Sequence, residues 1–130
     1  MAKVKSSKAT KKAKKRVVHV GTVHINSTFN NTIITFTDLN GNALGFCSCG
    51  KNFKGSRKST PYAAQVAGKE VAVRIRDAFS MREVHVRVKG PGSGRESAMR
   101  AIGEIIKIAT ITDVTGIPHN GCRAEKERRV

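Results

Sequence analysis

Residues 83–103 read EVHVRVKGPGSGRESAMRAIG, and this stretch decides the fold class. Val84, Val86 and Val88 alternate with polar residues, which is the period of a strand that buries one face and exposes the other. The residues on the second face are His85, Arg87 and Lys89. The stretch therefore predicts a half-buried strand over residues 83–89 with a basic outer face. The Gly-Pro-Gly run that follows should end it.

A helix and a further strand are predicted directly after it. Ser93 and Glu96 have the spacing of a capping box, in which each side chain bonds the other residue's backbone N–H. The apolar residues of the buried helix face would be Ala98, Ile102, Ile105 and Ile106. Residues 108–114 then predict a last strand. Because a strand–helix–strand crossover joins parallel strands, both strands should lie parallel in one sheet.

A longer helix is predicted before residue 83. Ser59 or Thr60 can cap its N-terminus, and Pro61 suits its first turn, where a missing N–H removes no hydrogen bond. Five residues at a spacing of four make one apolar stripe: Ala63, Ala67, Val71, Ile75 and Phe79. This stripe should pack against the sheet. Residues 50–58, which are rich in Gly and Lys, are predicted to be a loop before the helix.

The first half of the chain predicts three strands, over residues 17–25, 32–37 and 43–48, because β-branched residues cluster there between polar turns. Residues 26–31 form the first turn, and Asn40-Gly41 is a strong hairpin-turn signal in the second. The sequence thus predicts an α/β fold with one domain over residues 17–115. Its mixed five-stranded sheet has three antiparallel strands and then two parallel ones, with two crossover helices.

Charge is the strongest functional signal. The 130 residues include 25 Lys and Arg against 9 Asp and Glu, a formal net charge of +16. Residues 1–16 carry +8, residues 17–122 carry +6 and residues 123–130 carry +2. Both tails and the body therefore favour a polyanionic partner such as RNA. Residues 1–16 are expected to be a disordered basic tail, and residues 116–130 an extended basic tail.

The cysteine count and the hydropathy pattern indicate where the protein works. Cys47, Cys49 and Cys122 make an odd number, which is typical of a reducing compartment and argues against a disulfide framework. The N-terminus lacks the apolar segment of a signal peptide, and no apolar run approaches the roughly 20 residues of a membrane span. We expect a soluble, cytoplasmic protein, with location inside an organelle left open.

Two Gly-rich segments precede the predicted helices. Residues 51–60 carry four cations, and the helix that follows adds its N–H groups and positive dipole end, so this loop is predicted to bind phosphate. Lys89 and Arg95 flank the second segment, residues 89–96. It approaches a dinucleotide-binding fingerprint, but Ser97 replaces the third Gly, and the preceding strand is basic on one face instead of buried on both. We therefore expect phosphate contact and no nucleotide cofactor.

Catalytic and metal sites are not indicated. Cys47, Cys49, His119 and Cys122 could supply four zinc ligands, but the first pair lacks the usual two-residue spacing, so small buried thiols are favoured. Carboxylates are few and scattered, and Glu70 has the i+4 spacing for an ion pair with Arg74 on one helix. Metal-dependent cleavage of nucleic acid needs clustered carboxylates. The sequence predicts neither an enzyme nor a cofactor.

Four segments carry a family resemblance: FNNTII at 29–34, FKGSRKSTPYAAQ at 53–65, KGPGSGRESA at 89–98, and IPHNGCR at 117–123 with the terminal RRV. Together they resemble the universal small-subunit ribosomal protein eleven family in its bacterial form, over essentially the whole chain. The resemblance implies a ribonuclease-H-like sheet. It also implies a structural place on the platform of the small ribosomal subunit, near the cleft where messenger RNA exits and its ribosome-binding sequence pairs. Fold alone does not make such a protein a nuclease.

The resemblance and the charged segments together define the expected partners. These are small-subunit ribosomal RNA, the neighbouring ribosomal proteins six, seven and eighteen, and initiation factor three. The candidate RNA-binding residues are Lys12, Lys14, Lys15, Arg16, Asn30, Asn31, Lys51, Lys54, Arg57, Lys58, Lys89, Arg95, His119, Asn120, Arg123, Lys126, Arg128 and Arg129. Two alternatives stay open: a nucleic-acid enzyme, which would need a carboxylate cluster, and a free-standing protein that compacts duplex DNA.

Overall fold

The strand that opens the stretch quoted above lies inside a five-stranded sheet, with a strand on each side. The computed structural model describes residues 16–130, so the predicted tail over residues 1–16 lies outside the described part except for Arg16. The strands are β1 (Val20–Ser27), β2 (Thr32–Thr37), β3 (Ala43–Ser48), β4 (Glu83–Lys89) and β5 (Lys107–Asp113). The helices are α1 (Cys49–Asn52), a 3₁₀ helix (Gly55–Ser59), α2 (Pro61–Phe79) and α3 (Gly94–Gly103).

The strand order in the sheet is β3-β2-β1-β4-β5. β1 pairs with β2, and β2 with β3, in antiparallel fashion, whereas β4 runs parallel to both β1 and β5. The predicted mixed sheet is therefore confirmed, as are the two crossover helices, α2 between β3 and β4 and α3 between β4 and β5. The finer expectation of a ribonuclease-H-like arrangement stays a prediction.

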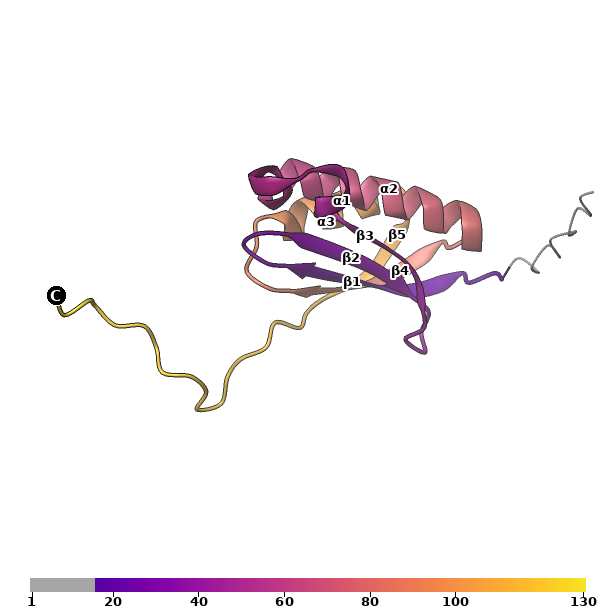
Figure 1. Ribbon diagram of the computed structural model, residues 1–130. Helices are drawn as coiled ribbons and strands as arrows, with labels where there is room; N and C mark the ends of the chain where they lie inside the picture. Colours follow the sequence, from indigo (N-terminus) through magenta and orange to yellow (C-terminus); the bar gives the residue numbers. More distant parts are fainter. Residues whose placement is uncertain (1–15) are drawn as a thin grey trace, which may run out of the picture.

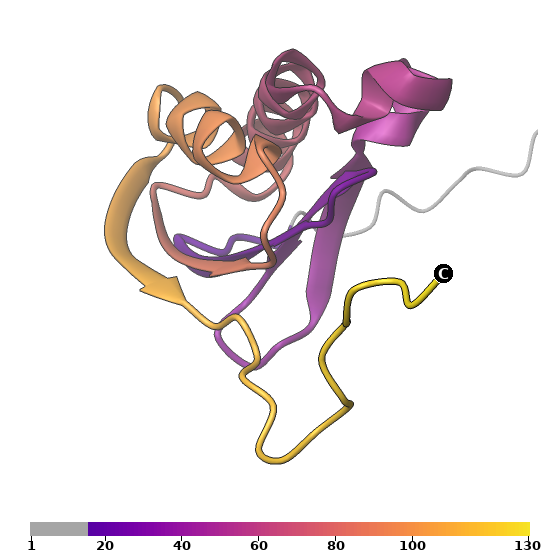
Figure 2. The same ribbon diagram turned by 90° about the vertical axis from the view of Figure 1, so that its left-hand side faces the viewer.

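The molecule has two layers, with α2 and α3 on the same face of the sheet (Figures 1 and 2). The alternation read from β4 is confirmed, because Val84, Val86 and Val88 are at most 1% exposed. They share one hydrophobic core with the apolar stripe of α2, whose residues Ala63, Ala67, Val71 and Ile75 are also buried. Small alanines let the helix lie close to the sheet, and burial of this apolar surface is the main stabilising term of the fold.

Three boundaries differ from the sequence reading. The first strand runs from Val20 to Ser27 instead of over residues 17–25, because the chain before it meets α2 instead of a strand: Val18 N–H bonds the carbonyl of Phe79. The last strand covers Lys107–Asp113, one residue earlier than predicted. The segment predicted as a loop over residues 50–58 contains the short α1 and the 3₁₀ helix. Polar and Gly-rich composition concealed these single turns, which local hydrogen bonds stabilise.

The predicted capping box of α3 is wrong. Ser93 precedes the helix but makes no capping bond with its side chain. Its hydroxyl donates instead to the carbonyl of Ser59, 3.2 Å away, the last residue of the 3₁₀ helix before α2. The hydroxyl that should have capped α3 thus joins two loops that are 34 residues apart in the sequence. At α2 the prediction is confirmed, because Thr60 accepts a hydrogen bond from the N–H of Ala63.

Candidate nucleic-acid interface

Three loops meet at one end of the sheet, where β1 and β4 end and α2 and α3 begin. The Gly92 N–H bonds the Ser27 carbonyl at 3.1 Å, which joins the loop after β4 to the end of β1. The Ser93–Ser59 bond joins the same loop to the 3₁₀ helix. Both helices therefore point the positive ends of their dipoles toward this end of the molecule. We call this region the loop end; it comprises residues 28–31, 54–60 and 90–94.

A hollow of about 410 Å³ lies within the loop end. Its lining residues are Asn30, Gly55, Ser56, Lys58 and Ser59. The structure thus brings together Asn30 and Lys58, two candidates predicted from different segments. Lys54, directly before the 3₁₀ helix, and Arg57, within it, are both exposed. A cation, an amide and two hydroxyls around a hollow form a surface that suits phosphate and sugar oxygens.

The predicted contribution of the α2 N–H groups is smaller than expected. Pro61 has no N–H, and Thr60 already accepts from Ala63 at 3.4 Å. Most of the donors at the start of α2 are therefore unavailable to an anion. Positive charge at the loop end comes from side chains and from the helix dipole more than from open amides.

Four of the candidates predicted to contact RNA also make contacts within the fold. Arg16 pairs with Asp38 at 2.8 Å and fixes the start of the described chain to the turn between β2 and β3. The Asn31 side chain donates to the Ser48 hydroxyl at 2.9 Å and connects the start of β2 to the end of β3. Lys51 pairs with Glu70 of α2.

Arg95, the fourth, connects the loop after β4 to the end of β5. It donates to the Gly90 carbonyl and to Asp113, both at 2.9 Å. Hydrogen bonds from Thr115, and then those from Arg95, hold the pKa of the Asp113 carboxyl well below its usual range. The Asp113 charge therefore persists at every physiological pH and fixes the point where the C-terminal segment leaves the sheet.

The remaining candidates lie on exposed segments or outside the described part. Lys89 is exposed at the end of β4. His119, Asn120, Arg123, Lys126, Arg128 and Arg129 all lie in an exposed segment without helix or strand. Lys12, Lys14 and Lys15 precede residue 16 and lie outside the described residues. In both ribbon views the C-terminal segment runs on the side of the sheet away from α2 and α3 (Figures 1 and 2).

Two features near this end were not selected from the sequence. Phe29, in the turn between β1 and β2, is 78% exposed beside Asn30. An aromatic residue inside a polar turn was the available signal, since exposed rings can stack on unpaired RNA bases. The second feature is Tyr62, which is 63% exposed and packs edge-on against Phe53 at 5.7 Å, so that the first turn of α2 contacts the residue directly after α1.

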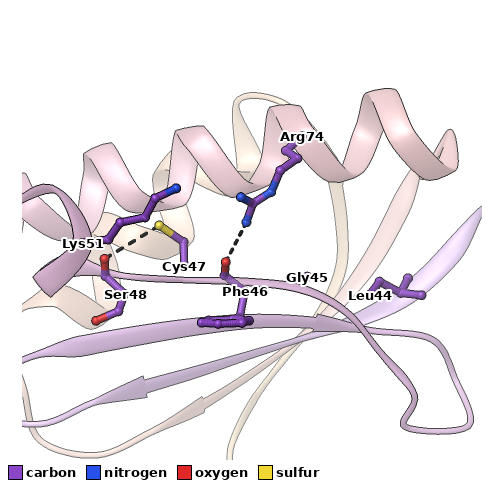
Figure 3. A pocket seen from close by; sticks show the side chains of 7 residues that line it. All are labelled: Leu44, Gly45, Phe46, Cys47, Ser48, Lys51 and Arg74. Atoms are coloured by element: carbon purple, nitrogen blue, oxygen red, sulfur yellow. Dashed lines mark hydrogen bonds between the residues drawn. The ribbon is translucent and has the colours of Figure 1, made fainter. Parts of the chain in front are cut away.

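A separate groove of about 440 Å³ lies between β3 and α2 (Figure 3). Arg74 reaches across it to the carbonyl of Phe46, which corrects the predicted ion pair between Arg74 and Glu70. Glu70 instead bonds Lys51 and Asn52 of α1, so the partner came from another helix and not from i+4 spacing. This groove shows how the short α1 is attached to the long helix.

The thiols near this groove are not activated. Burial first, and then the charge of Glu70, raise the pKa of Cys47, and burial also raises the pKa of Cys49. A thiol must ionise to act as a nucleophile or a metal ligand, so these cysteines behave as small core residues. Cys122 is exposed, far along the sequence in the C-terminal segment.

The described part of the chain has no grouped side chains that would support catalysis by carboxylates or a metal ion. Within residues 16–130, no three His, Cys, Asp or Glu side chains are grouped so that they could hold a metal ion. The carboxylates in that part mostly face cations, such as Asp38 with Arg16 and Glu104 with Lys69. None of the described helices is both long and apolar enough to cross a membrane.

Comparison with known proteins agrees with these observations. The family model described as ribosomal protein S11 matches residues 21–129. The small ribosomal subunit protein uS11 of Nitratidesulfovibrio vulgaris is 58% identical over 125 residues, which cover 95% of this chain and 96% of that protein. Its counterpart in Halorhodospira halophila is 57% identical over 132 residues and covers both chains in full. The counterpart in Neisseria meningitidis is 51% identical over the same span.

The resemblance noted in the sequence is thereby confirmed. The family model extends from the first strand almost to the end of the exposed C-terminal segment, so it includes both the sheet and the cation-rich loops. The relatives named above are more than 50% identical over almost the full length of both chains. The chain therefore belongs to the ribosomal protein S11 family.

Proposed function

We propose that this protein binds and bridges helices of ribosomal RNA on the platform of the small ribosomal subunit, near the cleft through which messenger RNA exits. Membership of the ribosomal protein S11 family makes the chain a structural ribosomal protein and not an enzyme. The named relatives are components of small ribosomal subunits. The finer position, on the platform, follows from the resemblance described above and is the part that experiments must test.

The observation that carries the proposal is the loop end. There Asn30 and Lys58 line one hollow, Lys54 and Arg57 are exposed beside it, and two helix dipoles point toward it. Cations near RNA displace condensed counterions, so binding should weaken steeply with salt. The C-terminal segment adds a second basic region at another part of the molecule. Two separate basic regions on one small body can hold two RNA helices at a fixed distance.

Charge reversal at the loop end tests the RNA contact. Arg57→Glu with Lys58→Glu should lower incorporation into small subunits at least tenfold in cells that also express the untagged wild-type chain, because two charge-assisted phosphate contacts are replaced by repulsion. The matched control is Arg76→Glu with Arg100→Glu, which reverses two exposed charges on the helix layer. Urea unfolding of each variant separates folding from binding. Equal incorporation of the two double variants would contradict the proposed role of the loop end.

The accessible thiol offers a direct test of position. Cys47 and Cys49 are at most 1% exposed, whereas Cys122 is exposed, so an iron chelate can be attached at Cys122 alone. In assembled small subunits, hydroxyl radicals from this position should cleave ribosomal RNA near the segment that pairs with the messenger's ribosome-binding sequence. Cys122→Ser, treated with the same reagent, is the control. Cleavage confined to RNA far from that segment would contradict the platform assignment.

The protein partners form a further part of the proposal. Ribosomal proteins six, seven and eighteen are the proposed neighbours, with initiation factor three as a transient one. The tails over residues 1–16 and 116–130 are proposed as RNA-binding extensions of a domain over residues 17–115. Chemical crosslinking of intact small subunits, followed by mass spectrometry, should join lysines of this chain to those neighbours. Crosslinks only to proteins of other subunit regions would contradict this part.

A further inference from the structure

The sheet has one face that no described helix covers. Figure 2 shows α2 and α3 together on the other side. Strand register places one residue from each strand in a single row across this open face: Phe46, Thr35, His24, Arg87 and Thr112. Their neighbours along the strands, such as Val23 and Val86, are buried under the helices. Because side chains alternate along a strand, the row must point away from the helix layer.

The open face is predominantly polar and positively charged. The adjacent row contains Lys89 of β4 opposite Asn26 of β1. Glu83 is the acidic residue that the described strands place on this face; it lies at one corner, beside Lys107 in the register. Arg87 and Lys89 are both exposed, and the described part of the chain places no carboxylate in an ion pair with either of them. Their charge is therefore available to an anionic partner.

Phe46 marks the edge of this face. It is 67% exposed, and its ring points away from α2 while its carbonyl accepts from Arg74 on the helix side (Figure 3). Phe46 and Arg87 are three strand spacings apart, roughly 14 Å. A base stacked on the ring and a phosphate at the guanidinium would therefore belong to different nucleotides of one RNA segment.

A one-sided sheet often simply faces water, so the open face needs more than exposure to indicate a partner. Three observations favour a polyanion. The exposed charge is almost wholly positive, an exposed aromatic ring lies at the edge, and the basic C-terminal segment runs on this same side of the sheet (Figures 1 and 2). Hydroxyl and imidazole groups between these points can bond sugar and phosphate oxygens.

We propose that the open face is a second RNA-contact surface, in which Arg87 and Lys89 pair with phosphates and Phe46 stacks on an unpaired base. The inference rests on the proposed function and deepens it, because it assigns a surface separate from the loop end. None of the residues in the row was among the candidates selected from the sequence. Lys89, in the adjacent row, is the one residue of the proposed surface that was. The loop end, where β1 and β4 end, and the open face of the sheet would thus be two separate RNA-contact regions.

Charge removal on opposite layers tests the phosphate contacts. The full chain carrying Arg87→Gln with Lys89→Gln is compared with Arg76→Gln with Arg100→Gln, which removes the same charge from the helix layer. Affinity for small subunits assembled without this protein is measured over a series of salt concentrations. The open-face variant should lower the slope of log K against log salt by about 2, since each lost phosphate contact removes about 1, and the control should leave it nearly unchanged.

The two outcomes that matter are distinguishable. If the wild-type chain binds these particles and both double variants have the same slope, the open face is not an RNA surface, while the proposed function stands. If the wild-type chain does not bind them at all, the proposed function itself fails. Urea unfolding of both variants shows whether a change in slope reflects lost contacts or lost structure.

A photoreactive residue tests the stacking contact and the class of partner. A benzophenone amino acid at position 46, in full-length protein assembled into small subunits, should crosslink to ribosomal RNA on irradiation. The matched control position is Val73, which is 38% exposed on α2 and should give no RNA crosslink. Crosslinks from position 46 to a protein neighbour, or no crosslink at all, would overturn the proposed RNA contact of Phe46.

Discussion

Gly90 is the residue on which the loop end most depends. Its φ of +98° lies in the region that favours glycine, and a Cβ there would collide with the carbonyl of Ser27. The same loop brings the Gly92 N–H to that carbonyl. The sequence indicated a Gly-rich break after β4, but the reason for this glycine is a contact with β1, about 60 residues earlier in the chain. A close contact between segments that are distant in the chain produces no local sequence pattern from which it could be predicted.

Gly90→Ala and Gly41→Ala separate conformation from crowding. Gly41 has a similar φ of +94° but nothing within 4 Å of a built Cβ. Gly41→Ala should lower the free energy of unfolding by about 1 kcal/mol, the cost of a left-handed alanine. Gly90→Ala should lower the free energy of unfolding by about 1–3 kcal/mol more than Gly41→Ala does, because its Cβ would also overpack the contact with Ser27. Urea unfolding followed by circular dichroism measures both, and equal losses would contradict the close contact with Ser27.

Asp38 should contribute to the response to acid. Hydrogen bonds from the Asn42 side chain and backbone, joined by those of Asn40 and the charge of Arg16, lower its pKa. The folded chain therefore takes up a proton at Asp38 less readily than the unfolded chain. Stability from this group is present above the ordinary carboxyl pKa of about 4 and is lost as the pH falls below it.

The acid response has a simple comparison. Thermal unfolding of wild type and Asp38→Asn is measured between pH 7 and pH 3. The variant should be the less stable protein at pH 7, and the difference should shrink below about pH 4, because the unfolded wild-type chain then takes up a proton at Asp38 more readily than the folded chain. A difference that stays constant across this range would show that the Asp38 carboxylate does not stabilise the turn. The sequence located this turn, yet Arg16 could not be predicted as a partner from 22 residues away.

At the scale of elements, the starts of α2 and α3 show what local sequence patterns can and cannot predict. Both α2 and α3 carried capping signals, and the α2 signal is confirmed by the bond from Ala63 to Thr60. At α3 the Ser93 hydroxyl is taken by the Ser59 carbonyl. Helix propensity and cap residues predicted the position of both helices. A tertiary hydrogen bond, however, uses the Ser93 hydroxyl that was expected to cap α3. The same limit explains Glu70, whose partners lie on α1.

Substitutions at the two helix starts should differ in effect. Thr60→Ala should lower the free energy of unfolding by about 1 kcal/mol, because it leaves the Ala63 N–H without its cap. Glu96→Gln should change it by less than about 0.5 kcal/mol, since no capping box exists and the exposed pair with Arg100 at 4.0 Å contributes little. Chemical denaturation measures both. A larger loss at Glu96 than at Thr60 would contradict the described caps.

At the scale of the whole molecule, the mixed sheet was predictable and the functional surfaces were only partly so. Alternation in β4 and the helix stripe gave the layers, because periodicity reports burial directly. Charge gave the class of partner. Alternation also predicted that Arg87 lies on the outer face of its strand, but which residues of other strands share that face depended on the strand order, which places β4 beside β1. Arg16, Lys51 and Arg95 have the same charge but carboxylate partners.

The N-terminal segment should add to RNA affinity through charge alone. Deleting residues 3–15 removes seven cations and keeps the pair between Arg16 and Asp38. The slope of log K against log salt should fall, by up to about 6 if every removed cation contacts a phosphate. A variant with the seven lysines changed to Gln keeps the length and should behave in the same way. An unchanged slope in both would show that this segment does not contact phosphate.

The central claim is that this chain grips ribosomal RNA as a fixed part of the small subunit. Cell extract separated on a sucrose gradient, with quantitative mass spectrometry of each fraction, tests it most directly. One copy of the chain per small subunit is expected, with almost none at the top of the gradient. Recovery of most of the chain at the top of the gradient, free of nucleic acid at moderate salt, would contradict it.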